Sequence, residues 1–134
     1  MPSDFLNAFS NILKQNGLDI NRGANYYVAS WNDFITSCIE GYPYSLFDYD
    51  LDIYMRGQID FLIKSPDLQG FSEFRIFKTK IEEIDNQLMS ITMDRPNKKQ
   101  LSLSWWENRI LKYAGPEYVK NILDIYDLKI ELVE

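Results

Sequence analysis

Three carboxylates that alternate along residues 48–52 are the first candidates for chemistry in this sequence. Asp48, Asp50 and Asp52 could together ligate a hard cation such as Ca²⁺, or could act as acid and base. A calcium loop beginning at Asp48 needs glycine at its sixth position and glutamate at its twelfth. Those positions hold Ile53 and Ile59. We therefore expect no metal site and no bound cofactor, and an enzyme that uses carboxylates alone is kept only as an alternative.

Histidine and cysteine limit the reactions that this chain could catalyse. The 134 residues include no His, which excludes Ser-His-Asp and Cys-His mechanisms. Cys38 is the single cysteine, and one thiol can form neither an intramolecular disulfide nor a cysteine-rich zinc site. Because its neighbours form an apolar helical pattern, we interpret Cys38 as a small buried hydrophobe. The composition favours a protein that binds over one that catalyses.

Charge is distributed unevenly along the chain, whose 20 Asp and Glu against 14 Lys and Arg give a net charge of −6. Residues 40–60 carry five acidic side chains against one basic, a balance of −4, and residues 95–112 carry the reverse, a balance of +4. The two regions could face each other, or the acidic one could dock a basic partner. Tyrosines between the acids would add rigid contact area. The residues predicted to bind a partner are Glu40, Asp48, Tyr49, Asp50, Asp52, Tyr54 and Asp60.

Two adjacent tryptophans in the basic region suggest an alternative partner. Trp105 and Trp106 would lie about 100° apart on a helix, so one of them should be partly exposed. An exposed indole beside a basic patch can stack on a base of single-stranded nucleic acid. The net negative charge argues against binding led by phosphate contacts. The residues of this alternative, a nucleic-acid-associated or adaptor domain, are Lys98, Lys99, Trp105, Trp106 and Arg109.

The elements that must position these residues follow from apolar spacing and helix-end signals. A first helix should start after Ser3 and stop at Gly17, with its buried face formed by Phe5, Leu6, Phe9, Ile12 and Leu13. A second should run from residues 27 or 28 to Gly41, with Asn25 as a candidate cap.

A third helix should carry the acidic residues. Ser45 and Asp48 have the spacing of a capping box, and Ser65-Pro66 should end the helix. Gly57 inside it should mark a kink or a close contact with another helix. The spacing predicts that its buried seam consists of Phe47, Leu51, Met55, Ile59 and Leu62.

The second half of the chain begins with the clearest periodicity. Spacings of three and four predict a long helix whose seam is Phe74, Phe77, Ile81, Ile84, Leu88 and Ile91, and a hairpin turning at Asp85-Asn86 is the alternative. The solvated side of that helix should hold Arg75, Lys78, Lys80, Glu82, Glu83 and Asp85.

Helix signals continue beyond a connecting loop at residues 94–100. Ser104 and Glu107 match a capping box that should start a short helix ending at Ala114, and Pro116 should open the last helix. Alternation over residues 128–132 would also suit a strand. The predicted fold is therefore all-α: a single domain over residues 1–134, with five or six bundled helices and room for a short C-terminal strand.

Residues 44–56 resemble a segment of small bacterial immunity proteins, which typically reads acidic-Tyr, a spacer, Asn-Asp-Leu and then Arg. Here it reads YSLFDYDLDIYMR, with Leu51 in place of Asn and Gly57 where an acid often follows Arg56. Residues 80–85 (KIEEID) and 105–115 (WWENRILKYAG) are also similar. The resemblance implies an antidote that binds one toxin domain of contact-dependent growth inhibition or a related polymorphic toxin system. Many such toxins are basic nucleases.

The same motif could instead serve as scaffold, with Asp52 and Arg56 paired at i and i+4 on one helix. The resemblance also implies a cytoplasmic protein. The sequence agrees with that location, because it lacks the basic and apolar stretches of a secretory signal, has no apolar run of about 20 residues and contains one unpaired cysteine.

Overall fold

The computed structural model describes residues 4–96 and 104–134, and helices make up most of them. In chain order the elements are α1 (Asp4–Gln15), α2 (Ala24–Gly41), α3 (Leu46–Asp52), α4 (Met55–Ile63), the 3₁₀ turn η1 (Pro66–Leu68), α5 (Ser72–Ser90), β1 (Thr92–Asp94), β2 (Arg109–Leu111), β3 (Tyr113–Ala114), α6 (Pro116–Tyr126) and β4 (Glu131–Leu132). The mostly helical fold is confirmed, and the strands β1, β2 and β3 are an addition to it.

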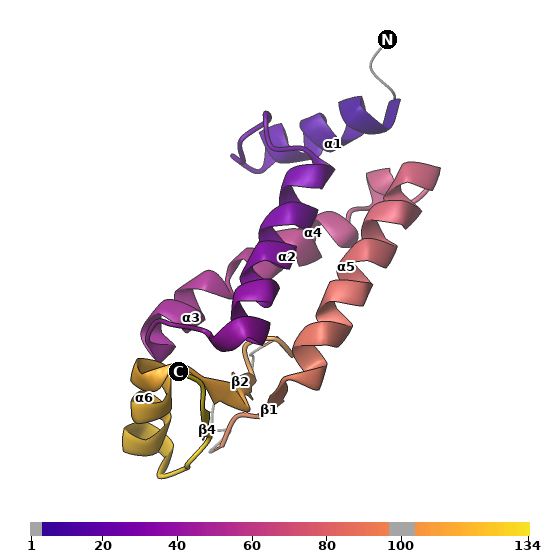
Figure 1. Ribbon diagram of the computed structural model, residues 1–134. Helices are drawn as coiled ribbons and strands as arrows, with labels where there is room; N and C mark the ends of the chain where they lie inside the picture. Colours follow the sequence, from indigo (N-terminus) through magenta and orange to yellow (C-terminus); the bar gives the residue numbers. More distant parts are fainter. Residues whose placement is uncertain (1–3, 97–103) are drawn as a thin grey trace.

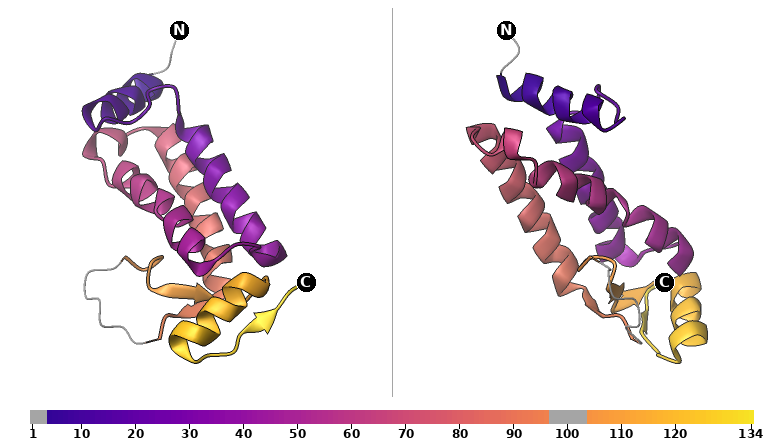
Figure 2. Two further views of the ribbon diagram at one scale, coloured as in Figure 1. Left: turned by 90° about the vertical axis from the view of Figure 1, so that its left-hand side faces the viewer. Right: turned by 180° about the vertical axis from the view of Figure 1, so that it is seen from behind.

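Two long helices, α2 and α5, lie side by side along the length of the molecule (Figure 1). The shorter pair α3 and α4 follows the same direction, and α4 packs on α2 (Figure 2). Helix α1 crosses one end of this arrangement and contacts η1, while the strands and α6 occupy the other end. Helix α3 reaches that second end and packs against α6.

The first two predicted helices are confirmed, with corrections at their edges. In α1 the predicted seam is buried except for Leu6, which is exposed, and Gly17 takes the left-handed conformation at φ 68°. Helix α2 has Gly23, not Asn25, at its N-cap. Cys38 is fully buried in α2, as expected, and burial raises the pKa of its thiol.

The predicted third helix is two helices, and its predicted seam is correct only in the second of them: Ile59 and Leu62 are buried, whereas Phe47 and Leu51 are exposed. The capping box is confirmed: Ser45 Oγ accepts from the Asp48 N–H at 3.0 Å, and Asp48 Oδ2 accepts from the Ser45 N–H at 3.3 Å. The break falls between α3 and α4, ahead of Gly57. There, backbone N–H groups donate to the carbonyl of the third preceding residue instead of the fourth. The buried side consists of Leu46, Tyr49, Ile53, Arg56, Ile59 and Leu62. Apolar periodicity could not include Arg56 in this side, because a charged residue is normally solvated.

The predicted long helix is confirmed as α5, which rules out the hairpin at residues 85 and 86. Its seam is buried from Phe74 to Leu88, and Ile91 lies just past its last turn. Asp85 was wrongly placed on the solvated side: it is only 9% exposed. The buried guanidinium of Arg56 stabilises its carboxylate there.

The short helix predicted for residues 104–114 does not form. Glu107 does reach back to the Ser104 N–H at 3.4 Å, but residues 105–108 form only a turn before β2 and β3. Strand β2 pairs antiparallel with β1, and Arg109 donates to Thr92 Oγ1 at 2.7 Å across that pair. This long-range pairing outweighs the local helix signal.

The C-terminal region follows one of the two predicted outcomes. Helix α6 starts at Pro116 after Gly115, as expected, and ends where Asp127 adopts a left-handed conformation at φ 53°. Residues beyond it form the short strand β4, which pairs in parallel with β3. The alternation over residues 128–132 therefore indicated the strand correctly.

Candidate protein-binding face

An apolar row on the outside of α3 is the most distinctive exposed feature of the acidic region. Phe47, Leu51 and Tyr54 are 64%, 68% and 62% exposed. Phe47 and Leu51 are four residues apart on one side of α3, and Tyr54 follows in the turn that leads to α4. Asp48 and Asp52 are exposed beside this row. We call these five residues the α3 face. Large exposed apolar side chains flanked by polar ones are typical of protein interaction sites.

The two carboxylates of the α3 face also hold local structure. Asp48 completes the capping box, and Asp52 Oδ2 accepts a hydrogen bond from Tyr42 Oη at 2.7 Å. At the start of the helix, Asn121 Oδ1 of α6 accepts from the Leu46 N–H at 3.0 Å. These bonds fix α3 at both ends, so the face is presented on a backbone that is already ordered.

The other predicted partner-binding acids lie in different settings. Glu40 is exposed near the end of α2. Asp50 accepts from Arg95 at 2.7 Å, and Asp60 of α4 lies 2.8 Å from Lys64 Nζ and 3.6 Å from Arg56 Nη1. The Asp50–Arg95 pair joins the acidic and basic regions. The expectation that these regions face each other is therefore met at this pair.

Tyr49 was wrongly placed at the contact surface. It is fully buried, with its ring packed against Phe34, Tyr42 and Tyr118 at centroid distances of 5.7, 5.7 and 5.5 Å. Its hydroxyl has no hydrogen-bond partner among the described residues. The ring stabilises the core under α3 and is not available to a partner.

Alkaline pH should destabilise the protein through this aromatic core. Burial raises the pKa of Tyr49, Tyr42 and Tyr118, so they stay protonated in the folded state when the unfolded chain ionises near pH 10. The unfolded state then binds fewer protons, and the free energy of unfolding falls as pH rises above about 10. Urea unfolding at several pH values measures this. Tyr49→Phe, which removes a hydroxyl without a partner, should make the fall shallower, and an unchanged slope would contradict the assignment.

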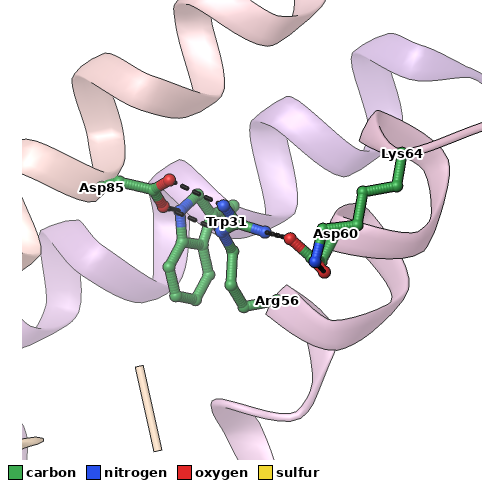
Figure 3. A network of polar contacts seen from close by, with 5 residues as sticks. All are labelled: Trp31, Arg56, Asp60, Lys64 and Asp85. Atoms are coloured by element: carbon green, nitrogen blue, oxygen red, sulfur yellow. Dashed lines mark hydrogen bonds and ion pairs between the residues drawn. The ribbon is translucent and has the colours of Figure 1, made fainter. Parts of the chain in front are cut away.

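A buried ion pair lies on the inner side of α4 (Figure 3). Arg56 donates to Asp85 of α5 through two bonds, Nε to Oδ1 at 2.9 Å and Nη2 to Oδ2 at 2.8 Å. Trp31 Nε1 of α2 donates to the same carboxylate at 3.0 Å, and the Trp106 ring lies 4.9 Å from the guanidinium. The pair therefore ties three helices to the turn that precedes β2.

The ion pair corrects the predicted scaffold and limits the chemistry available there. Arg56 pairs with Asp85 and Asp60, not with Asp52 as the sequence suggested. Both oxygens of Asp85 already accept strong hydrogen bonds, so this carboxylate is not free to act as a base or a metal ligand. Across residues 4–96 and 104–134, no group of three His, Cys, Asp or Glu is placed to hold a metal ion.

The residues of the nucleic-acid alternative do not form an open stacking surface where the structure describes them. Trp106 is buried and Trp105 is half-buried, which confirms that one of them is partly exposed. The guanidinium of Arg109 donates hydrogen bonds to Thr92 and Asp94 within the chain. Lys98 and Lys99 lie outside the described residues.

A second exposed apolar region lies at the opposite end of the bundle. A hollow of about 620 Å³ between α1, α2 and α5 is lined by Leu6, Tyr26 and Ile76, all partly open to solvent. It carries none of the predicted partner-binding residues, so it serves as a reference surface for the α3 face.

In the part of the chain that the structure describes, no helix combines the length and the apolar character needed to span a bilayer. Comparisons with models of protein families, with curated proteins and with solved structures found no match to this chain.

Proposed function

We propose that this chain is an immunity protein that neutralises a bacterial toxin domain by binding it in a one-to-one complex. The observation that carries the proposal is the α3 face, an exposed apolar row flanked by carboxylates inside the segment that resembles immunity proteins. Inhibition of this kind needs no reaction on the part of the antidote. It needs only a surface that covers the toxin.

The chemistry of the α3 face indicates what its partner should look like. Aromatic and leucine side chains supply contact energy when they are desolvated, and carboxylates at the rim speed the encounter with a basic surface. Asp50 and Asp60 are paired with cations, but Asp48 and Asp52 remain exposed beside this row. A basic toxin domain with exposed apolar residues would complement the face in both respects.

The size and rigidity of the site also suit a stable complex. A standard interface buries about 800 Å² on each partner, which is about a tenth of the 8143 Å² accessible surface of this chain. Because the capping box, Asn121 and Arg95 already hold α3, binding would order little additional backbone.

The partner can be sought next to the gene for this chain. We expect the adjacent reading frame to encode a large secreted protein with a toxin module at its C-terminus. The purified module should form a one-to-one complex with the chain by light scattering, and co-expression should restore growth of cells that produce the module. Failure of the chain to bind or to protect would contradict the proposal.

Removing the charge of the α3 face should weaken the complex in a salt-dependent manner. We expect Asp48→Asn with Asp52→Asn to lower affinity for the toxin module about tenfold at about 50 mM salt and much less at about 500 mM. Asparagine keeps an oxygen that can accept from the Ser45 N–H and from Tyr42 Oη, so α3 should stay folded. Calorimetric titration at both salt concentrations measures the effect.

The matched control is Asp67→Asn with Glu83→Gln, which changes the net charge equally at exposed positions outside α3 and α4. It should leave both the affinity and its salt dependence close to those of the unmodified chain. Equal behaviour of the two double variants would show that the α3 face is not the contact surface.

A further inference from the structure

Gly57 has no structural reason to be glycine. It lies within α4, outside the left-handed conformations that favour glycine, and a Cβ at this position would meet no atom within 4 Å. Glycine is among the least favourable residues inside a helix, and alanine would fit here without strain. The fold therefore accepts a weaker helix at a position where packing within the chain does not require it.

The missing side chain opens onto a surface hollow. This hollow has a volume of about 440 Å³, and it lies between α4 and the connection from α1 to α2. Tyr54 and Phe61 form two of its walls, and both rings are partly open to solvent. The residues that line it are Asn16, Leu18, Tyr54, Gly57, Gln58 and Phe61, and none of them is charged.

The hollow is continuous with the α3 face, because Tyr54 belongs to both. The α3 face also carries the exposed carboxylates of Asp48 and Asp52. A partner that covers both the hollow and the α3 face would meet an uncharged hollow with two aromatic walls next to the negative charge of the carboxylates. Its complementary surface would carry an apolar projection surrounded by basic side chains.

We propose that this hollow receives an apolar side chain, of the size of leucine or phenylalanine, that projects from the basic surface of the toxin domain. The inference rests on the proposed function and adds the anchor point of the complex. Without a Cβ at Gly57, the inserted side chain can pack directly on the backbone of α4 between Tyr54 and Phe61. Buried apolar anchors of this kind commonly carry much of the energy of an interface.

Substitutions at Gly57 separate binding from folding. We expect Gly57→Ala to raise the melting temperature by roughly 2–5 °C, because alanine favours the helix, while it weakens toxin binding about threefold. Gly57→Leu should fill the hollow and weaken binding at least about tenfold. Because the hollow is uncharged, neither substitution should change the salt dependence of binding, in contrast to Asp48→Asn with Asp52→Asn. Thermal unfolding and calorimetric titration with the toxin module measure both properties.

Gly70→Ala is the control, since a Cβ at Gly70 also meets open space and Gly70 does not line the hollow. It should leave binding unchanged. If Gly57→Ala and Gly57→Leu bind the toxin module as tightly as the unmodified chain while the acidic double variant binds more weakly, the anchor is wrong and the proposed function stands. If the unmodified chain does not bind the module at all, both proposals fall.

Discussion

Asp85→Ala is expected to lower the free energy of unfolding by about 3–5 kcal/mol, because it removes the hydrogen-bonded carboxylate of a buried guanidinium and leaves it only Asp60, 3.6 Å away. Arg56 is only 5% exposed, and Asp85 supplies both acceptors of its paired hydrogen bonds. The same substitution leaves Trp31 Nε1 without its acceptor. Urea unfolding followed by circular dichroism measures the loss, which should exceed the loss caused by replacing any of the exposed carboxylates of α5.

Two comparisons show whether the loss comes from the unpaired charge. Glu82→Ala removes an exposed carboxylate from the same helix and should change stability by no more than about 0.5 kcal/mol. Arg56→Met combined with Asp85→Leu removes both charges and should recover most of the stability lost in Asp85→Ala. If the double variant is as unstable as the single one, the loss reflects packing and not the uncompensated guanidinium.

This ion pair illustrates what the sequence could not reveal about the core. The seam of α5 was visible in the spacing from Phe74 to Leu88, because burial of one helical face imposes that spacing. Asp85 stands beside the seam, where a charged residue is normally solvated. Its partner Arg56 lies 29 residues away on another helix, so no local pattern connects the two.

The region after α5 was mispredicted because local and long-range signals compete there. The spacing of Ser104 and Glu107 matches a helix start, and the glutamate does bond back to residue 104. Arg109 nevertheless pairs with β1, and β3 pairs with β4 near the end of the chain. Pairing between strands distant in sequence depends on the assembled fold, which local capping signals do not encode.

The sequence revealed the α3 face only in part, because this segment carries two apolar stripes. Two apolar stripes run along residues 46–54, one through Leu46, Tyr49 and Ile53, the other through Phe47, Leu51 and Tyr54. Either stripe could have formed the core. Tyr49 packs on Phe34 of α2 and Tyr118 of α6, so the first stripe forms the core and the second stays exposed. A helix with two apolar stripes is therefore a signal of an interface as much as of a core.

Phe47→Ser combined with Leu51→Ser should abolish measurable protection against the toxin and lower affinity about 100-fold or more, equivalent to about 3 kcal/mol. Both side chains are more than half exposed in the free protein, so their loss creates no cavity in the core. The cost should appear only in the complex, where the side chains would be desolvated against the partner. Calorimetric titration with the toxin module and a growth-protection assay measure it, and thermal unfolding should show a nearly unchanged free protein.

Leu6→Ser combined with Ile76→Ser is the matched control, because it removes two exposed apolar side chains from the hollow between α1, α2 and α5. This variant should bind and protect like the unmodified chain. The reverse outcome, with binding lost in the control and retained in the α3 variant, would move the interface to the α1 end of the bundle. It would leave the carboxylates of Asp48 and Asp52 with purely structural roles, because their hydrogen bonds to Ser45 and Tyr42 would then be their only observed function.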